Sequence, residues 1–218
     1  MTSATPITMD PGSVLHTWAD NPKSIGSLAA IQMGIFASDK EIASTSNFVS
    51  NIVQYRILDK LLNFIKSTER DQFESGILAL SFLTENCSEI VEILVKKNIV
   101  GLIVRFMKDR KEGLRATAAL CCRNLYVGKP SVQKGFIREG GAEMLIELLD
   151  SDDSVTVFET ILNLLDLLLD PDDIIQPDIK KQLISLGVSN QLQRILSQDS
   201  RYEQETIKEA EKLLQLFE

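Results

Sequence analysis

The chain has 218 residues, of which 44% are hydrophobic and 25% are charged, and its formal net charge at pH 7 is −8. This is the composition of an ordinary soluble protein, and the acidic balance argues against a nucleic-acid binder. No apolar run reaches the ~20 residues that a membrane helix needs, and residues 1–12 lack the basic start and apolar run of a secretory signal.

In chain order, residues 1–12 predict a flexible tail because they are rich in Thr, Ser and Pro. Residues 13–218 predict one helical domain, since apolar side chains recur there with helical spacing and the breaks between periodic segments are short. The expected helices cover residues 13–18, 24–36, 47–55, 59–66, 72–84, 114–126, 132–138, 142–149 and 202–217.

An internal repeat organises this domain. Residues 56–65 align with 98–107 and then with 140–149, at an offset of 42 each time. A further copy, 187–196, follows 47 residues later, and a degenerate first copy ends at Trp18. A period near 42 is that of three-helix armadillo repeats and overlaps the HEAT range. The glycine before a middle helix, as at Gly140, predicts a sharp chain reversal through positive φ.

The stretch 114–149 resembles the junction between two armadillo repeats, because a long helix, a short helix, a glycine and a third helix follow one another. The resemblance is strongest at Ala118–Leu125 and at Phe136–Ala142 (FIREGGA). It implies an all-α, right-handed α-solenoid of armadillo-like repeats, with about three full repeats and partial terminal ones. The third helices of successive repeats would then line a binding groove.

The resemblance also assigns candidate binding positions. Importin alpha and beta-catenin bind extended peptides through an Asn near the end of each third helix, and only Asn124 keeps that residue here; Phe82 and Asp166 stand at the equivalent positions. Importin alpha adds a Trp one turn earlier on each third helix. The equivalent positions here hold Leu78, Leu120 and Leu162. One Asn cannot form the ladder, so importin-like binding is not expected. The predicted protein-binding residues are Leu78, Phe82, Arg115, Leu120, Arg123, Asn124 and Asp166.

These residues predict an apolar strip with charged edges, which suits a helix or a folded protein surface better than an extended polar peptide. The alternative is that the leucines pack between the helices of neighbouring repeats. Arg123→Glu is expected to leave folding intact and to weaken partner binding.

Charge is distributed unevenly along the repeats. Residues 96–138 contain 11 Lys and Arg but only two acids, whereas residues 139–179 contain 12 acids and neither Lys nor Arg. Such polarity can steer a partner and fix its register. The alternative interpretation is that the outer faces of helices are charged by chance.

No catalytic constellation is visible. His16 is the only histidine, and the three cysteines, Cys87, Cys121 and Cys122, fit a helical apolar pattern. The sequence therefore predicts no catalytic residue, no cofactor, no metal and no small-molecule substrate. Free cysteines favour a reducing compartment, so we expect a cytoplasmic protein, with nuclear or cytoskeletal/ciliary association as alternatives.

The sequence therefore predicts a non-enzymatic protein-interaction scaffold or adaptor, which could be one subunit of a larger complex. The alternative is a nucleotide-exchange cofactor of Hsp70. The stretches 124–130 and 201–214 are similar to parts of the armadillo-type exchange factors, although their N-terminal helical region has no clear counterpart here.

Overall fold

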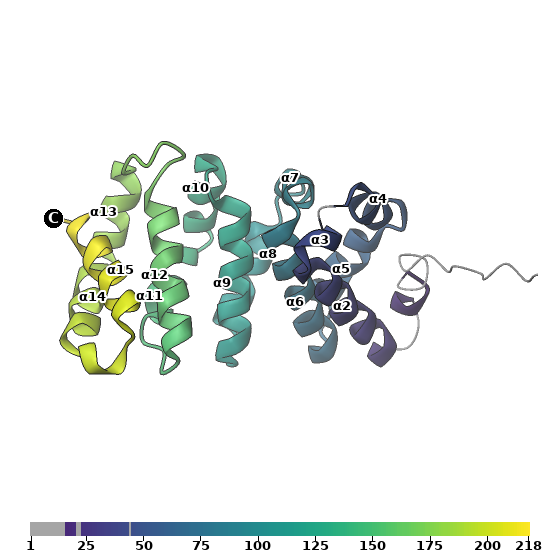
Figure 1. Cartoon of the computed structure of the whole chain (residues 1–218), viewed down its shortest axis with the longest axis horizontal. Helices are drawn as coiled ribbons and strands as arrows, with labels where there is room; N and C mark the ends of the chain where they lie inside the picture. The colour runs from purple at the N-terminus through teal and green to yellow at the C-terminus, as the bar shows by residue number, and fades with distance from the viewer. Residues whose placement is uncertain (1–15, 21–22, 44) are drawn as a thin grey trace, which may run out of the picture. The chain divides into compact units, whose positions relative to one another are not determined.

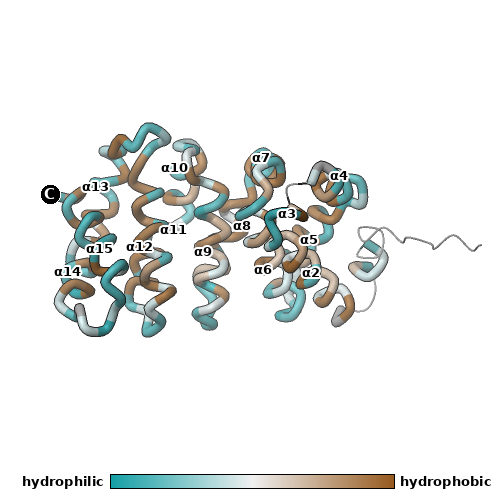
Figure 2. The backbone as a smooth tube through the Cα atoms, in the orientation of Figure 1, coloured by the Kyte–Doolittle hydropathy of each residue, from teal (hydrophilic) through white to brown (hydrophobic). Residues whose placement is uncertain are grey.

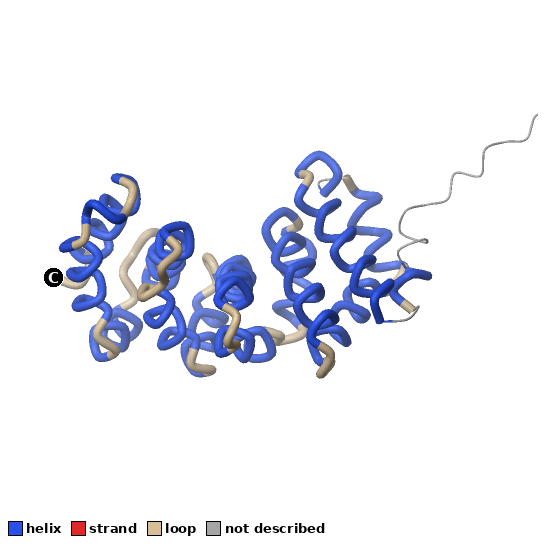
Figure 3. The backbone as a smooth tube through the Cα atoms, turned by 90° about the horizontal axis from the view of Figure 1, so that it is seen from below, coloured by secondary structure: helices blue, strands red, loops and turns tan. Residues whose placement is uncertain are grey.

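The computed structural model describes residues 16–20, 23–43 and 45–218, and this part of the chain forms helices joined by short turns, without a strand (Figures 1 and 3). The predicted tail, residues 1–12, lies outside the described residues. The contacts of the chain fall into two compact units, residues 1–90 and 91–218. The prediction of a single domain over 13–218 stays a prediction.

Unit 1 is built around a close packing of its first and last long helices, α2 and α6. A Cβ atom added at Gly34 of α2 would lie 3.3 Å from the Cα of Ala79 and 3.0 Å from the ring of Phe82, both on α6. Small residues therefore allow the two backbones to approach. The helices are α2 (Lys23–Ser38), α3 (Lys40–Ala43), α4 (Ser46–Gln54), α5 (Ile57–Lys66) and α6 (Arg70–Asn86).

Unit 2 repeats one order of elements: a short helix, a middle helix and a long third helix. Its elements, with α7 crossing from unit 1, are α7 (Ser88–Lys96), α8 (Val100–Val104), η1 (Arg105–Lys108), α9 (Glu112–Tyr126), α10 (Pro130–Arg138), α11 (Gly141–Leu148), α12 (Ser154–Leu168), α13 (Pro177–Ser185), α14 (Val188–Ser197), η2 (Asp199–Arg201) and α15 (Gln204–Gln215). The third helices α9, α12 and α15 pack in sequence. Figure 2 shows apolar residues recurring along these helices and hydrophilic turns between them.

Four equivalent residues confirm the repeat register. The four copies that begin within the described residues each start with a residue in the left-handed backbone region: Arg56 (φ 53°), Asn98 (φ 52°), Gly140 (φ 87°) and Gly187 (φ 85°). The chain reverses there into the middle helix. Glycine adopts this conformation without steric cost, and Asn tolerates it better than other residues. The predicted use of positive φ at Gly140 is confirmed.

The last repeat is complete rather than partial, since α13, α14 and α15 keep the three-helix order. Its longer spacing comes from the loop between α12 and α13. An isolated antiparallel bridge joins Leu169 to Ile175 across this loop. The Asp170 Oδ1 atom accepts hydrogen bonds from the backbone N–H groups of Asp172 and Ile174, both at 2.9 Å. The extra residues thus form an ordered turn and remove no helix.

Candidate functional site

The candidate surface in unit 2 is the side of the third helices that does not pack into the repeat core. On α12 this side carries Val155, Phe158, Leu162 and Asp166, which follow one another at helical spacing. Val155 is 65% exposed, and the other three are half-buried. In contrast, Ile161 and Leu165, which face inward on the same helix, are buried. Apolar side chains therefore remain accessible on a helix whose opposite side is fully packed.

The predicted binding residues are divided between the two units, and all seven are half-buried. Leu78 and Phe82 lie on α6 in unit 1, where the Phe82 ring covers Gly34 of α2. The other five lie in unit 2: Arg115, Leu120, Arg123 and Asn124 on α9, and Asp166 on α12.

The structure brings two of the predicted residues into direct contact. The Arg123 Nε atom donates a hydrogen bond to Asp166 Oδ2 at 2.6 Å, and its Nη1 atom donates to Glu159 Oε2 at 3.3 Å. The Arg123 side chain is only 23% exposed. Its guanidinium therefore joins α9 to α12, besides lying at the candidate surface. The expectation that Arg123→Glu leaves folding intact is revised, because the new carboxylate would meet two others.

Arg115 lies nearer the start of α9 and is less fully paired. Its Nη2 atom is 3.7 Å from Glu112 Oε2. Its Nε atom is buried without a hydrogen-bond partner. This arginine keeps donor capacity that the chain itself does not use.

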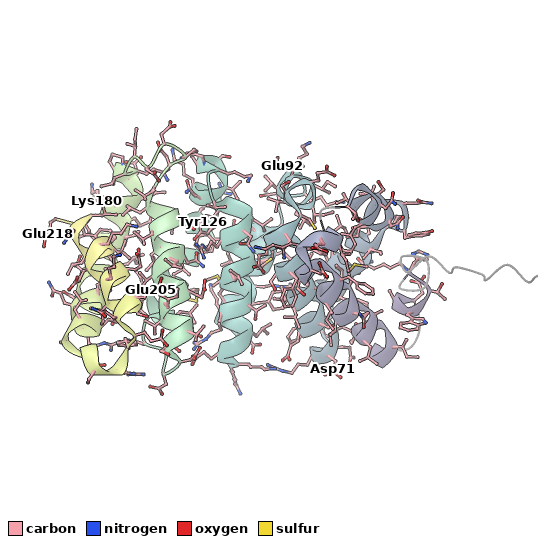
Figure 4. The ribbon with its side chains drawn as sticks, viewed as in Figure 1. Asp71, Glu92, Tyr126, Lys180, Glu205 and Glu218 are labelled. Atoms are coloured by element: carbon pink, nitrogen blue, oxygen red, sulfur yellow. The ribbon has the colours of Figure 1, made fainter. Side chains whose placement is uncertain are left out.

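Sequence reasoning missed a buried polar network between α9 and α12. The Tyr126 hydroxyl donates to the Asn163 backbone oxygen at 2.8 Å and also contacts Asn163 Oδ1. The Asn163 Nδ2 atom in turn donates to the backbone oxygen of Ala119 at 3.1 Å. Tyr126 lies between these helices in Figure 4. The available signal was a lone Asn in the apolar run ILNLLDLLL, because a buried amide needs partners.

Burial dominates the chemistry of this network. It raises the pKa of the Tyr126 hydroxyl well above its ordinary value of 10.0, and the neighbouring Cys122 and Asp166 act in the same direction, whereas Arg123 opposes them. Burial likewise raises the pKa of the Cys122 thiol well above 9.0. A neutral thiol is a poor nucleophile, so the arrangement suits packing rather than covalent chemistry.

A second missed residue, Gln133 of α10, holds the start of the α12–α13 loop. Its buried Nε2 atom donates to the backbone oxygens of Asp166 at 2.8 Å and Leu169 at 3.0 Å. Its Oε1 atom accepts a hydrogen bond from Gln176 Nε2 at 2.8 Å. Gln133 therefore holds the backbone of Asp166, while Arg123 holds its carboxylate.

Comparison with known proteins decides the fold. No protein-family model and no curated protein matches the chain. Among solved structures, it is similar to ARO, an armadillo repeats only protein from Plasmodium falciparum, with 25% identity and a TM-score of 0.79 over 99% of this chain and 87% of that one. The chain has an armadillo-repeat fold.

Two further structures share these armadillo repeats at lower identity. One is a designed armadillo repeat protein in complex with the peptide (KR)4, with 17% identity and a TM-score of 0.76 over 94% of this chain and 81% of that one. The other concerns a phosphorylation switch that controls the interaction between cadherin and beta-catenin, with 15% identity and a TM-score of 0.74 over 95% of this chain and 38% of that one. These likenesses extend the agreement in fold.

The described part of this armadillo-repeat chain offers no cluster of three or more His, Cys, Asp or Glu side chains suited to a metal ion. Within the same residues, no helix combines the length and apolar character that crossing a membrane would require. What the site offers is a contact surface. Apolar side chains of α12 lie beside Arg123, whose guanidinium is already paired with Asp166 and Glu159.

Proposed function

We propose that this armadillo-repeat chain is a non-enzymatic protein-interaction scaffold or adaptor, and that in unit 2 its binding surface is the exposed side of α9, α12 and α15. The observation that carries the proposal is the line Val155, Phe158 and Leu162 on α12, accessible beside Leu120 on α9. A contiguous, partly exposed apolar line on an otherwise well-packed element is consistent with a docking surface. The solved neighbours, which include proteins studied with a peptide and with cadherin, support this assignment.

The partner that suits this surface presents apolar side chains from a helix or a folded surface. Asn124 is the single residue of the Asn ladder, so the amide contacts that hold an extended backbone are largely missing. Leu120 and Leu162 instead provide area that a partner's apolar side chains can bury. Membership of a larger assembly is part of the proposal, with Leu78 and Phe82 of unit 1 as further contact residues.

Introduction of a negative charge at an apolar surface residue tests this proposal. Leu120→Glu and Leu162→Glu should each lower recovery of the bound partner at least about tenfold, because a carboxylate would be desolvated without a counter-charge. The measurement is quantitative affinity purification with mass spectrometry, using the tagged full chain in its native source.

The matched control is Ile184→Glu, which makes the same change at a 44% exposed position on α13. Circular dichroism melts establish that all variants fold. If both groove variants recovered the same partners as Ile184→Glu and the wild type, the proposed surface would be wrong.

A further inference from the structure

A hollow of about 80 Å³ lies between α12 and the start of α15, at the opposite end of the exposed α12 face from Asp166. Ser154, Val155 and Phe158 line it from α12, and Glu203, Glu205 and Thr206 line it from the other side. Glu205 projects from α15 beside α12 in Figure 4. The hollow thus has an apolar wall, with Val155 65% exposed, and an acidic wall.

We propose that this hollow receives a lysine or arginine side chain of the protein partner. The inference rests on the proposed function and adds the chemical class of one partner residue and the place where it docks. Within the hollow, the apolar wall contacts the aliphatic part of that side chain, and the two glutamates contact its charged end.

The charges around the hollow favour a cation. In the described structure, neither the Glu203 nor the Glu205 carboxylate forms an ion pair or a side-chain hydrogen bond, and both residues are exposed. The arginine closest in sequence, Arg201, is already engaged: its Nη2 atom is 2.7 Å from Asp152 Oδ1 and 3.1 Å from the backbone oxygen of Ser151. The negative charge of Glu203 and Glu205 is therefore free to pair with a partner.

The two ends of the α12 face differ in this respect. At the far end, Arg123 pairs with both Asp166 and Glu159 from within the chain. At the hollow, none of the described Lys or Arg side chains of unit 2 pairs with Glu203 or Glu205. The dipole of α15 also favours acidic residues near its first turn. That effect does not explain why Val155, on the opposite wall of the hollow, is exposed.

Lysine and arginine match both walls. Their methylene stems can cover Val155 while the charged group stays near water and the carboxylates. A cation above the Phe158 ring gains a further attraction. An acidic side chain would be repelled, and a purely apolar one would leave two carboxylates partly desolvated without a counter-charge.

The test uses the folded full chain and a fluorescein-labelled (KR)4 peptide, read by fluorescence polarisation. The comparison peptide has the same length, with acetyl-lysine for each lysine and citrulline for each arginine, so that it keeps the size but loses the charge. We expect E203Q/E205Q to weaken (KR)4 binding about five- to tenfold. V155S should weaken it about twofold to threefold, through loss of the apolar wall.

The matched control is E211Q/E218Q, which removes two exposed acids from the same end of the chain but outside the hollow. Selective loss of affinity in E203Q/E205Q, together with no binding of the uncharged peptide, supports the proposal. Equal effects of the two double variants, equal binding of the two peptides, or no binding of (KR)4 to the wild type would each overturn it. The proposed function is judged separately, by the partner recovery of Leu120→Glu and Leu162→Glu.

Discussion

At the scale of single residues, buried polar side chains determine how neighbouring repeats fit together in unit 2. Apolar burial alone would specify the register of α9 against α12 less strictly, because the hydrophobic effect is not directional. The hydrogen bonds from Tyr126 to Asn163 and from Asn163 to Ala119 are directional and lie in a buried site. A buried polar group that loses its partner costs about 1–3 kcal/mol, so these bonds penalise any other register.

Tyr126 also predicts a pH dependence of stability. Its pKa in the folded state is raised well above 10.0. Above that pH the unfolded chain releases the phenol proton while the folded chain keeps it. The stability is therefore complete below about pH 10 and falls as pH rises, by up to about 1.4 kcal/mol per pH unit for one proton. The raised pKa of Cys122 adds a similar loss that starts near its ordinary value of 9.0.

The variant that isolates this effect is Tyr126→Phe. We expect it to cost about 1 kcal/mol near neutral pH, through the lost hydrogen bond, and to lose stability less steeply than the wild type between about pH 9.5 and about pH 11. Urea unfolding midpoints at several pH values measure both effects. Ile161→Val, which removes one buried methyl group and no titratable group, should keep the wild-type slope; parallel slopes for Tyr126→Phe and the wild type would refute the assignment.

At the scale of elements, the middle helices begin with the same backbone conformation, although different residues adopt it in different repeats. Arg56, Asn98, Gly140 and Gly187 all have positive φ. For a residue with a Cβ atom this conformation costs roughly 1–2 kcal/mol, less for Asn. The copy that begins at Arg56 therefore has more strain to release than the copy that begins at Asn98.

Glycine substitution at these two positions tests the geometry. We expect Arg56→Gly to stabilise the fold by about 0.5–1 kcal/mol, after the larger chain entropy of glycine is subtracted. Asn98→Gly should be nearly neutral. The measurement is the change in unfolding free energy by chemical denaturation, with Lys66→Gly near the end of α5 as a control that should be destabilising. The variant also removes the exposed hydrogen bond from Arg56 Nε to Asp59 Oδ2 (3.0 Å), so Arg56→Ala, which loses the same bond but keeps a Cβ atom, is the reference. An Arg56→Gly variant no more stable than Arg56→Ala would show that the left-handed conformation at this position carries no strain.

The elements were largely predictable from the sequence, whereas their cross-contacts were not. The helix predicted over residues 59–66 covers most of α5, and its Leu61, Leu62 and Ile65 are all buried, because local periodicity reports which side of a helix faces the core. Arg123 and Asp166 were both expected at the binding surface, yet their mutual ion pair joins residues 43 positions apart. No local pattern specifies such a pair, since it depends on how two helices pack and which rotamers they allow.

At the scale of the whole molecule, the uneven charge of the sequence acquires a structural role in unit 2. Acids from the block 139–179 pair with arginines from both flanking repeats: Asp166 and Glu159 with Arg123, Asp150 with Arg194, and Asp152 with Arg201. Part of the charge reversal therefore links successive repeats. Glu203 and Glu205 lie outside this block, and their exposed carboxylates, for which the described residues provide no ion pair, are available to a partner. The Hsp70 exchange-factor alternative stays a prediction, which a nucleotide-release assay would test.

This role of charge predicts how one substitution responds to salt. Arg123→Glu replaces two attractive contacts between α9 and α12 with two repulsive ones, in a site where the side chain is 23% exposed. We expect it to destabilise the fold by about 2 kcal/mol at low ionic strength, between the values typical of surface and buried pairs. Raising NaCl from about 0.05 to about 1 M screens the repulsion and should reduce this penalty by roughly half. Urea denaturation of the variant and the wild type at both salt concentrations gives the two differences.

Ile161→Val, a packing change without charge, should keep a constant penalty across the same range. A salt-independent penalty for Arg123→Glu would mean that Arg123 joins the repeats through packing of its stem, and that the charge pattern of the chain does not hold α9 and α12 together.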